Sequence, residues 1–440
     1  MATDLSLPDI PEGRELEDYV AALALADGLF VEKQIVEKEQ KEILELDIVC
    51  SDYQSGRPRR QLLEVKSGKW GFPDLFKLLG WKTYLSHRAG DIPRAYLIAT
   101  QLRDQKVIDL ADKALSQFGI ELIAVDDHEA VHAAMADRGL LSKPDDQRSR
   151  DVWRYSHWVE RKYRERLRSW ARQHPSHVGV RKVLNYLDLI DNSSFFVKSL
   201  PERITLLYEA HFGHPRLAMS LCEELDGKPF NATDPMAGKT WREAMRRGMH
   251  PVVDACFHYE HKSRLAILKA AVDYAHLVKL GEGPELAQCG DGWVVATAAL
   301  PSSFYRAVRR IKSMAFADRL PAFWQTFLWK WGGFILLDEK HGDFADLAAE
   351  TGVPIGSIDA AMRVYDTLFP MGSGRSWFYG IPASEPKAKV LKMFPAQMKG
   401  LGANYRIWRS GKGDFEGFAG EAPYRRLIDW NNDLCKLLSE

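Results

Sequence analysis

The sequence predicts an N-terminal α/β domain followed by mostly α-helical domains. Up to about residue 125, short segments rich in β-branched and apolar residues alternate with helical patterns, whereas strand signals become rare beyond about residue 128. A stretch of glycine and polar residues around residue 285 indicates a second boundary. We therefore expect three regions, 1–130, 131–285 and 286–440.

Length and composition are typical of a soluble globular protein. The chain has 440 residues, 46% of them hydrophobic, which suffices for two or three cores. Lysine plus arginine equals aspartate plus glutamate, 60 each, so contact with a polyanion requires local basic patches. The 5 cysteines are scattered without a C-x-x-C pair, which favours a reducing compartment. We expect a cytoplasmic protein without a signal peptide or membrane span.

The first region begins with a helix and continues through three strands. Segment 13–28 has apolar residues at Leu16, Val20 and Leu23, which form one helical stripe. Three strand-like segments follow, "LFVEKQIVE", "EILELDIVCS" and "QLLEVKS". Helical patterns in "PDLFKLLGWKTYLSH" and "DQKVIDLADKALSQFG" then alternate with the strands "RAYLIAT" and "IELIAV". The predicted order is α-β-β-β-α-β-α-β.

Acidic residues fall on two consecutive strands of this region. Glu64 and Lys66 are two residues apart in the third strand and therefore share a face. Asp47 lies in the preceding strand and can lie beside Glu64 if the strands pair. Two carboxylates held close repel each other unless a cation or proton lies between them. An incomplete set of oxygen ligands favours Mg²⁺, which binds phosphate oxygens, and a nearby lysine stabilises charge on a phosphate.

Asp47 together with Glu64-Val65-Lys66, with a helix before and after, resembles the PD-(D/E)XK nuclease superfamily, which includes restriction endonucleases and Mrr-like enzymes. The resemblance covers about residues 10–128. It implies a restriction-endonuclease-like core with a mixed central sheet flanked by helices, and Mg²⁺-dependent hydrolysis of DNA with Mn²⁺ as a substitute. Leu46 stands where the motif has proline, a departure that we consider harmless.

The resemblance also implies roles for individual residues. Asp47 and Glu64 are expected to be metal ligands, and Glu17 on the first helix is expected to complete the site. Lys66 is expected to stabilise charge and orient the attacking water. Glu45 shares the strand face of Asp47 and is an alternative ligand. The non-functional interpretation of the same pattern is a solvated strand edge with a Glu/Lys pair.

The helix after the motif offers candidate contacts to DNA. Lys77, Trp81 and Tyr84 share one face of it. The resemblance implies that this helix contacts DNA, which makes Lys77 and Tyr84 candidates. The alternative is that the two aromatic side chains pack on the sheet while Lys77 extends toward solvent.

Segment 148–172 interleaves basic with aromatic residues, a composition that suits phosphate contact and base stacking. Its candidate DNA contacts are Arg154, Arg161, Arg164 and Arg168. An interdomain helix with an apolar face and solvated charges has the same composition, so both interpretations stay open.

Segment 343–380 is typical of a helix-turn-helix followed by a wing, with Gly352 at the turn. The second helix carries Asp359 and Asp366 beside Arg363, and these acids would repel phosphates. We therefore expect a winged-helix-like segment that is structural or binds a partner protein rather than one that reads bases.

Histidines in the middle of the chain permit a zinc hypothesis. His258 and His261 follow Asp254 at helical spacing, and His211 and His214 form a second pair. Hydrogen-bonded histidines of a helical domain are the simpler interpretation.

Together these features predict a Mg²⁺-dependent deoxyribonuclease whose partner is DNA. Bacterial defence against foreign DNA is the favoured role. The alternatives are a DNA-repair nuclease and an inactive nuclease-fold scaffold that binds DNA or a partner protein. The sequence has no Walker A or dinucleotide motif, so ATP-driven movement would require a partner protein. A homo-oligomer is left open.

Overall fold

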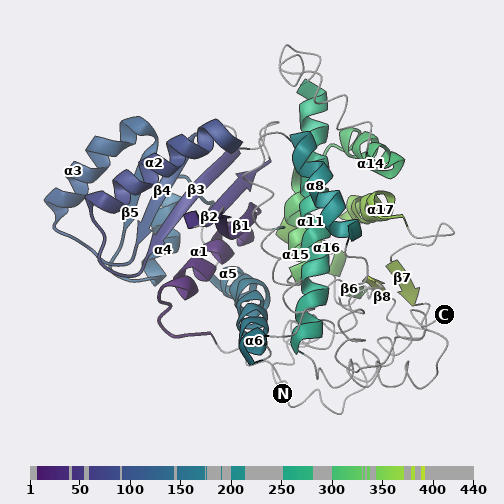
Figure 1. Cartoon of the computed structure of the whole chain (residues 1–440), viewed down its shortest axis with the longest axis horizontal. Helices are drawn as coiled ribbons and strands as arrows, with labels where there is room; N and C mark the ends of the chain where they lie inside the picture. Colours follow the sequence, from purple (N-terminus) through teal and green to yellow (C-terminus); the bar gives the residue numbers. More distant parts are fainter. Residues whose placement is uncertain are drawn as a thin grey trace.

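The computed structural model describes residues 7–38, 42–53, 59–89, 92–142, 146–173, 175, 190, 200–213, 251–280, 300–329, 331, 334–336, 343–370, 378–381 and 388–391. Two regions lie side by side: a sheet with flanking helices, and a group of helices around the long helix α11 (Figure 1). A helical segment, α5 to α6, lies below the place where they meet (Figure 1).

The N-terminal region has the predicted α/β class and the predicted order of elements. Its elements are α1 (Arg14–Ala26), β1 (Phe30–Lys38), β2 (Glu42–Asp52), β3 (Arg59–Lys66), α2 (Phe72–Ala89), β4 (Arg94–Ala99), α3 (Gln105–Leu115), the 3-10 turn η1 (Ser116–Phe118), β5 (Ile120–Ala124) and α4 (Glu129–Asp137). A further helix, α4, follows the last predicted strand.

The five strands form one mixed sheet in the order β1-β2-β3-β4-β5. Strands β1, β2 and β3 are antiparallel, whereas β3, β4 and β5 run parallel. Parallel neighbours require crossover connections, and here α2 and α3 provide them. Leu75 and Leu78 of α2 pack with Leu62 and Leu97 on one face of the sheet. Helices α1 and α4 pack against the opposite face, so the sheet is covered on both sides.

Helix α1 is buried far more completely than its sequence pattern predicts. One apolar stripe was expected, but every residue from Asp18 to Ala26 is buried. The helix contacts the sheet on one side and α4, α5 (Asp146–Val152) and the π-helical turn η2 (Trp153–Trp158) on the others. Its run of alanines and leucines is apolar all round, as is typical of a core helix.

A continuous helical segment joins the two regions. Helix α5 passes into η2 and then into α6 (Val159–Gln173), which confirms the predicted helical segment. Trp153 and Trp158 belong to the core with α1, and the rings of Tyr19 and Trp153 lie 5.1 Å apart. These aromatic side chains therefore attach the segment to the sheet region. No pattern in the sequence predicted the π-helical turn.

The second region is mostly helical, as expected. Its elements are α8 (Leu200–Gly213), α11 (Pro251–Leu280), α14 (Ser302–Lys312), the 3-10 turn η3 (Ala317–Arg319), α15 (Leu320–Trp329), β6 (Phe334–Leu336), α16 (Asp343–Thr351), the 3-10 turn η4 (Ile355–Ser357), α17 (Ile358–Leu368), β7 (Phe378–Ile381) and β8 (Ala388–Leu391). Helix α11 packs against α6, α8, α14 and α15. In the core, Trp324 of α15 stacks on Tyr365 of α17 at 4.7 Å.

The two regions meet at the edge strand β1. Phe30 and Tyr53 pack into the core of the helical region. The side chain of Gln325 on α15 forms hydrogen bonds with the backbone of this edge strand. The Val31 N–H donates to Gln325 Oε1 at 3.0 Å, and Gln325 Nε2 donates to the Val31 carbonyl at 2.6 Å. A side-chain amide thus occupies the place of a neighbouring strand and protects the edge from pairing.

Two parts of the predicted architecture fall outside the described residues, namely the boundary near residue 285 and the wing residues 372–377. Within the described part of the chain, no helix combines the length and apolar character needed to cross a membrane.

Candidate active site

Asp47 and Glu64 lie beside each other on adjacent strands. The antiparallel register of β2 and β3 pairs Ile48 with Leu63, and Asp47 and Glu64 are the next residues along the two strands. The backbone N–H of Val65 donates to Asp47 Oδ2 at 2.8 Å. This bond holds the Asp47 carboxylate against the middle of the E-x-K segment.

The Glu64 side chain is buried rather than solvated. Its side chain is only 2% exposed because α2 covers this side of the sheet. Its Oε1 pairs with Lys66 Nζ at 2.8 Å and with Lys77 Nζ at 3.6 Å. Its Oε2 is buried and accepts no hydrogen bond. One carboxylate oxygen is therefore satisfied by two ammonium groups, while the other is available to a ligand.

The acidic groups interact strongly with one another. Burial raises the pKa of Asp47 well above its usual value, and the charges of Glu64 and Glu17 raise it further. Burial also raises the pKa of Glu17. Burial lowers the pKa of Lys66, but the hydrogen bond and charge of Glu64 outweigh it, so that this pKa is raised overall. Carboxylates in this state favour a proton or a bound cation between them.

Glu17 is positioned from two sides. The start of α1 is tied to the end of β3, because the Gly13 N–H donates to Ser67 Oγ at 2.8 Å. The Gln34 side chain of β1 donates from Nε2 to Glu17 Oε2 at 3.2 Å. Neither Ser67 nor Gln34 was singled out from the sequence as part of the site. The Ser-Gly after the E-x-K segment was the available signal for Ser67, whereas Gln34 carried none.

Gln34 completes a row of polar residues across three strands. The register of β1 and β2 pairs Lys33 with Ile48 and Ile35 with Leu46, so Gln34 faces Asp47. Gln34, Asp47 and Glu64 therefore follow one another across β1, β2 and β3.

The donor chemistry suits a hard divalent cation. Carboxylate oxygens are the ligands that Mg²⁺ prefers, and Glu64 Oε2 is a buried oxygen without a hydrogen-bond donor. In the described part of the chain, no three His, Cys, Asp or Glu side chains converge tightly enough to hold a metal. Glu17 remains bonded to Gln34. The residues that could hold the ion are thus Asp47 and Glu64, with Glu17 as an addition.

The alternative ligand Glu45 lies apart from this group. Its Oε1 pairs with Arg14 Nη2 of α1 at 3.2 Å. This contact directs Glu45 toward the start of α1 and gives it a structural partner.

The two DNA-contact candidates of α2 lie in different environments. Lys77 is 46% exposed, and its Nζ lies 3.9 Å from the centre of the Trp81 ring while pairing with Glu64. The Tyr84 hydroxyl donates to Glu37 Oε1 of β1 at 3.0 Å, and its ring packs against the core under α2. Lys77 thus borders the candidate site, whereas Tyr84 packs on the sheet. DNA contact stays a prediction for both.

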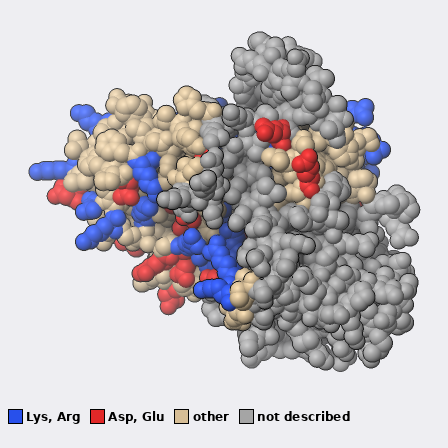
Figure 2. Space-filling view, in the orientation of Figure 1, with Lys and Arg blue, Asp and Glu red and all other residues tan. Residues whose placement is uncertain are grey.

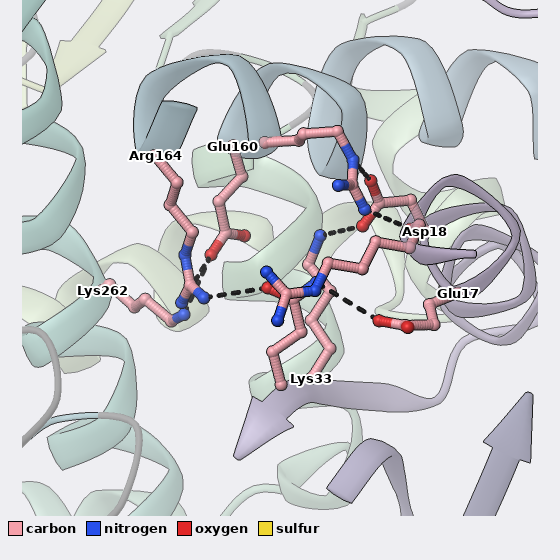
Figure 3. A network of polar contacts seen from close by, with 9 residues as sticks. Glu17, Asp18, Lys33, Glu160, Arg164 and Lys262 are labelled. Carbon is pink, nitrogen blue, oxygen red and sulfur yellow. Dashed lines mark hydrogen bonds and ion pairs between the residues drawn. The ribbon is translucent and has the colours of Figure 1, made fainter. Parts of the chain in front are cut away.

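The arginine candidates of η2 and α6 also lie in different environments. Arg161 donates to Asp18 of α1, and Arg164 Nη1 donates to Gln34 Oε1 at 3.1 Å (Figure 3). Arg168 is exposed, and Lys and Arg side chains gather over the region of α6 in Figure 2. The side chain of Arg154 lies outside the described residues. Two of the predicted DNA contacts therefore have partners inside the protein, and DNA contact of all four stays a prediction.

Two of the histidines in the zinc hypothesis, His211 and His261, have partners within the protein. His211 Nδ1 lies 2.9 Å from Ser263 Oγ, and His261 Nδ1 lies 3.4 Å from the Tyr365 hydroxyl. His214 and the side chains of Asp254 and His258 lie outside the described residues. The observed contacts are those of hydrogen-bonded core histidines.

The chain matches no protein-family model, and the searches of curated proteins and of solved structures also find no match. Function is therefore inferred from the residues and their arrangement.

Proposed function

We propose that the sheet region is a PD-(D/E)XK-like nuclease that hydrolyses DNA phosphodiester bonds with Mg²⁺. The observation that carries the proposal is the pair of adjacent carboxylates, Asp47 and Glu64, at a buried position with two lysines at one end. The order of elements and the mixed sheet agree with the fold that the resemblance implies. DNA is the proposed substrate because the resemblance implies it.

Asp47 and Glu64 would hold the ion, with Glu17 as an auxiliary ligand. When bound there, Mg²⁺ supplies a Lewis acid for the phosphodiester and lowers the pKa of a coordinated water. The Lys66 ammonium is charged at neutral pH, because its pKa is raised. It therefore stabilises negative charge that develops on the phosphate and orients the water rather than accepting a proton. Lys77 adds a second positive charge at the same carboxylate.

The test is cleavage of linear and supercoiled DNA by the full chain with Mg²⁺ or Mn²⁺. Lys66→Ala should lower the rate by about 100-fold, as is typical of removing one charge-stabilising group. Lys113→Ala is the matched control, because Lys113 is an exposed lysine on α3 of the same region. Equal rates for all three proteins would remove Lys66 from the mechanism. DNA binding without cleavage, across several substrates and both ions, would favour the inactive scaffold instead.

We also propose that helices α16 and α17, within the predicted segment 343–380, form a winged-helix-like unit with strands β6, β7 and β8 that binds a partner protein. Helices α16 and α17 are joined by a turn at Gly352, which has a φ of 70°. Strands β6, β7 and β8 form an antiparallel sheet in the order β6-β8-β7. The acidic residues of α17 make DNA contact unfavourable. Arg363→Ala should therefore leave DNA affinity unchanged in a mobility-shift assay, and a clear loss would assign base or phosphate contact to α17.

A further inference from the structure

Gln34 has an unusual backbone conformation. Among the described residues it is the only non-glycine residue with a positive φ, 53°. Strand β1 packs an apolar side chain on one face of the sheet before Gln34 and on the other face after it. Val31 belongs to the core with α1, whereas Ile35 belongs to the core with α2. A residue held in the left-handed region persists only when its surroundings determine it strongly, and such residues cluster at functional sites.

The side chain of Gln34 is fixed at both ends of its amide. Its Nε2 donates to Glu17 Oε2 at 3.2 Å, and its Oε1 accepts from Arg164 Nη1 at 3.1 Å. The amide thus binds a candidate metal ligand with one atom and α6 with the other. The bond uses Oε2 of Glu17 and leaves Oε1 available to the ion.

Arg164 is in turn held by the helical region. Its Nη2 lies 3.5 Å from Glu160 Oε1, and Lys262 Nζ of α11 donates to the same oxygen at 2.9 Å. All three side chains are mostly buried. Polar contacts therefore run without interruption from α11 through α6 to β1 and then to Glu17 (Figure 3).

A second contact path lies beside the first. Lys33, the neighbour of Gln34, pairs with Asp18, the neighbour of Glu17, at 2.5 Å. Arg161 of α6 also donates to Asp18 and to the backbone carbonyl of Arg14. Helix α6 therefore holds both strand β1 and helix α1 next to the candidate site, and a movement of α6 would disturb both.

We infer that Gln34 is a positioning residue, which orients Glu17 toward the metal and is itself held by the helical region through Arg164, Glu160 and Lys262. The inference rests on the proposed nuclease function and extends it: metal binding in the sheet region depends on the polar contacts that run from α11 through α6 to Gln34. Hydrogen bonds to ligating carboxylates fix their orientation, and their removal lowers metal affinity by about 10- to 100-fold.

The test measures Mn²⁺ affinity of the full chain by isothermal titration calorimetry, without DNA or turnover. Gln34→Ala and Gln34→Gly should each weaken binding by about tenfold. Glycine adopts the left-handed conformation easily, so a loss common to both variants reports the amide and not backbone strain. Circular dichroism confirms that each variant is folded.

Matched control variants distinguish a loss of Glu17 orientation from a general weakening of the contacts between the two regions. Gln325→Ala removes another side-chain amide that binds β1 from the helical region, and it should change Mn²⁺ affinity less than twofold. Lys262→Met should weaken binding by about threefold, whereas Arg138→Met, which breaks an exposed ion pair with Asp112, should not. An unchanged or tighter affinity in the Gln34 variants would overturn the inference, and so would an equal loss in Gln325→Ala.

A further variant, Asp47→Asn, distinguishes failure of the Gln34 inference from failure of the proposed nuclease function. If the wild-type protein binds Mn²⁺ and Asp47→Asn abolishes this binding, the metal site stands, and only the Gln34 variants decide the inference. If the wild-type protein neither binds Mn²⁺ nor cleaves DNA, the proposed function itself is wrong.

Discussion

Two aspartates, Asp47 on β2 and Asp273 on α11, lie at mostly buried positions but in opposite electrostatic environments. Burial raises the pKa of Asp47, and the neighbouring carboxylates of Glu64 and Glu17 raise it further. Burial also disfavours the charge of Asp273, but Lys269 and Arg203 outweigh this effect and lower its pKa. The sign of the neighbouring charges, rather than burial itself, therefore separates the two sites.

The site of Asp273 contains its own counter-charges. Arg203 Nη1 and Lys269 Nζ each lie 3.6 Å from Asp273 Oδ2, and Lys269 Nζ also lies 3.3 Å from Glu32 Oε2 of β1. This cluster joins the helical region to the sheet. Within the described residues, Asp47 forms no ion pair and accepts one backbone hydrogen bond. A buried acid with excess negative charge nearby is the typical state of a functional group, whereas a neutralised cluster is the typical state of a structural one.

The largest expected difference is in activity. Asp47→Asn should lower the DNA cleavage rate by about a thousandfold, because an amide neither holds Mg²⁺ as a carboxylate does nor polarises its water. Asp273→Asn should leave the rate per folded molecule within about twofold. Single-turnover cleavage with Mg²⁺ measures both. A comparable loss in the two variants would contradict the division into a functional and a structural site.

The next largest effect is on the free energy of unfolding, where the Asp273 variant rather than the Asp47 variant should show the larger loss. Asp273→Asn should lower the free energy of unfolding by about 3 kcal/mol, because it leaves Arg203 buried without its partner and leaves Lys269 paired with Glu32 alone. Asp47→Asn should leave it unchanged or raise it in metal-free buffer, because the repulsion with Glu64 disappears. Urea titration followed by tryptophan fluorescence measures the free energy of unfolding. A destabilised Asp47→Asn variant would show that Asp47 has a structural role.

The dependence of stability on pH should also have opposite signs at the two sites. Folded Asp47 binds its proton more tightly than unfolded Asp47 does, so its contribution to stability falls as pH rises through its raised pKa. Folded Asp273 binds its proton less tightly, so its contribution is present above the usual aspartate pKa and is lost as pH falls below it. Each contribution changes by at most about 1.4 kcal/mol per pH unit. Urea titrations of each Asn variant and the wild type across pH 3–8 isolate these contributions.

A smaller effect is expected from His157, a neutral group buried where the two regions meet. Burial lowers its pKa well below 6.5, and the charges of Lys33 and Lys262 lower it further. The unfolded chain binds this proton first, so stability should fall as pH decreases below about 6.5, by about 1 kcal/mol at pH 5.5. His157→Phe should flatten the curve in this range. An unchanged slope would show that His157 is protonated equally in both states.

Periodicity and local composition predicted the order of elements, whereas the pairing of β2 with β3 entered only as the condition for Asp47 to lie beside Glu64. Strand alternation correctly placed Glu64 and Lys66 on one face, because that relation depends on local geometry. It did not predict that α2 covers this face and buries Glu64, since burial depends on contacts between distant segments. The partners of Arg161 and Arg164 were missed for the same reason: Asp18 and Gln34 lie more than 100 residues away. Gln34 was missed because a single glutamine in a strand gives no signal of its backbone conformation.

The amide of Gln325 has a consequence for how the sheet region can be produced. A recombinant fragment that ends before the helical region would expose the Val31 backbone groups and the apolar Phe30 side chain to solvent. We expect such a fragment to self-associate through β1, so that its hydrodynamic size would grow with concentration. The intact chain thus contains, in α15, the segment that keeps its own sheet from adding strands from another molecule.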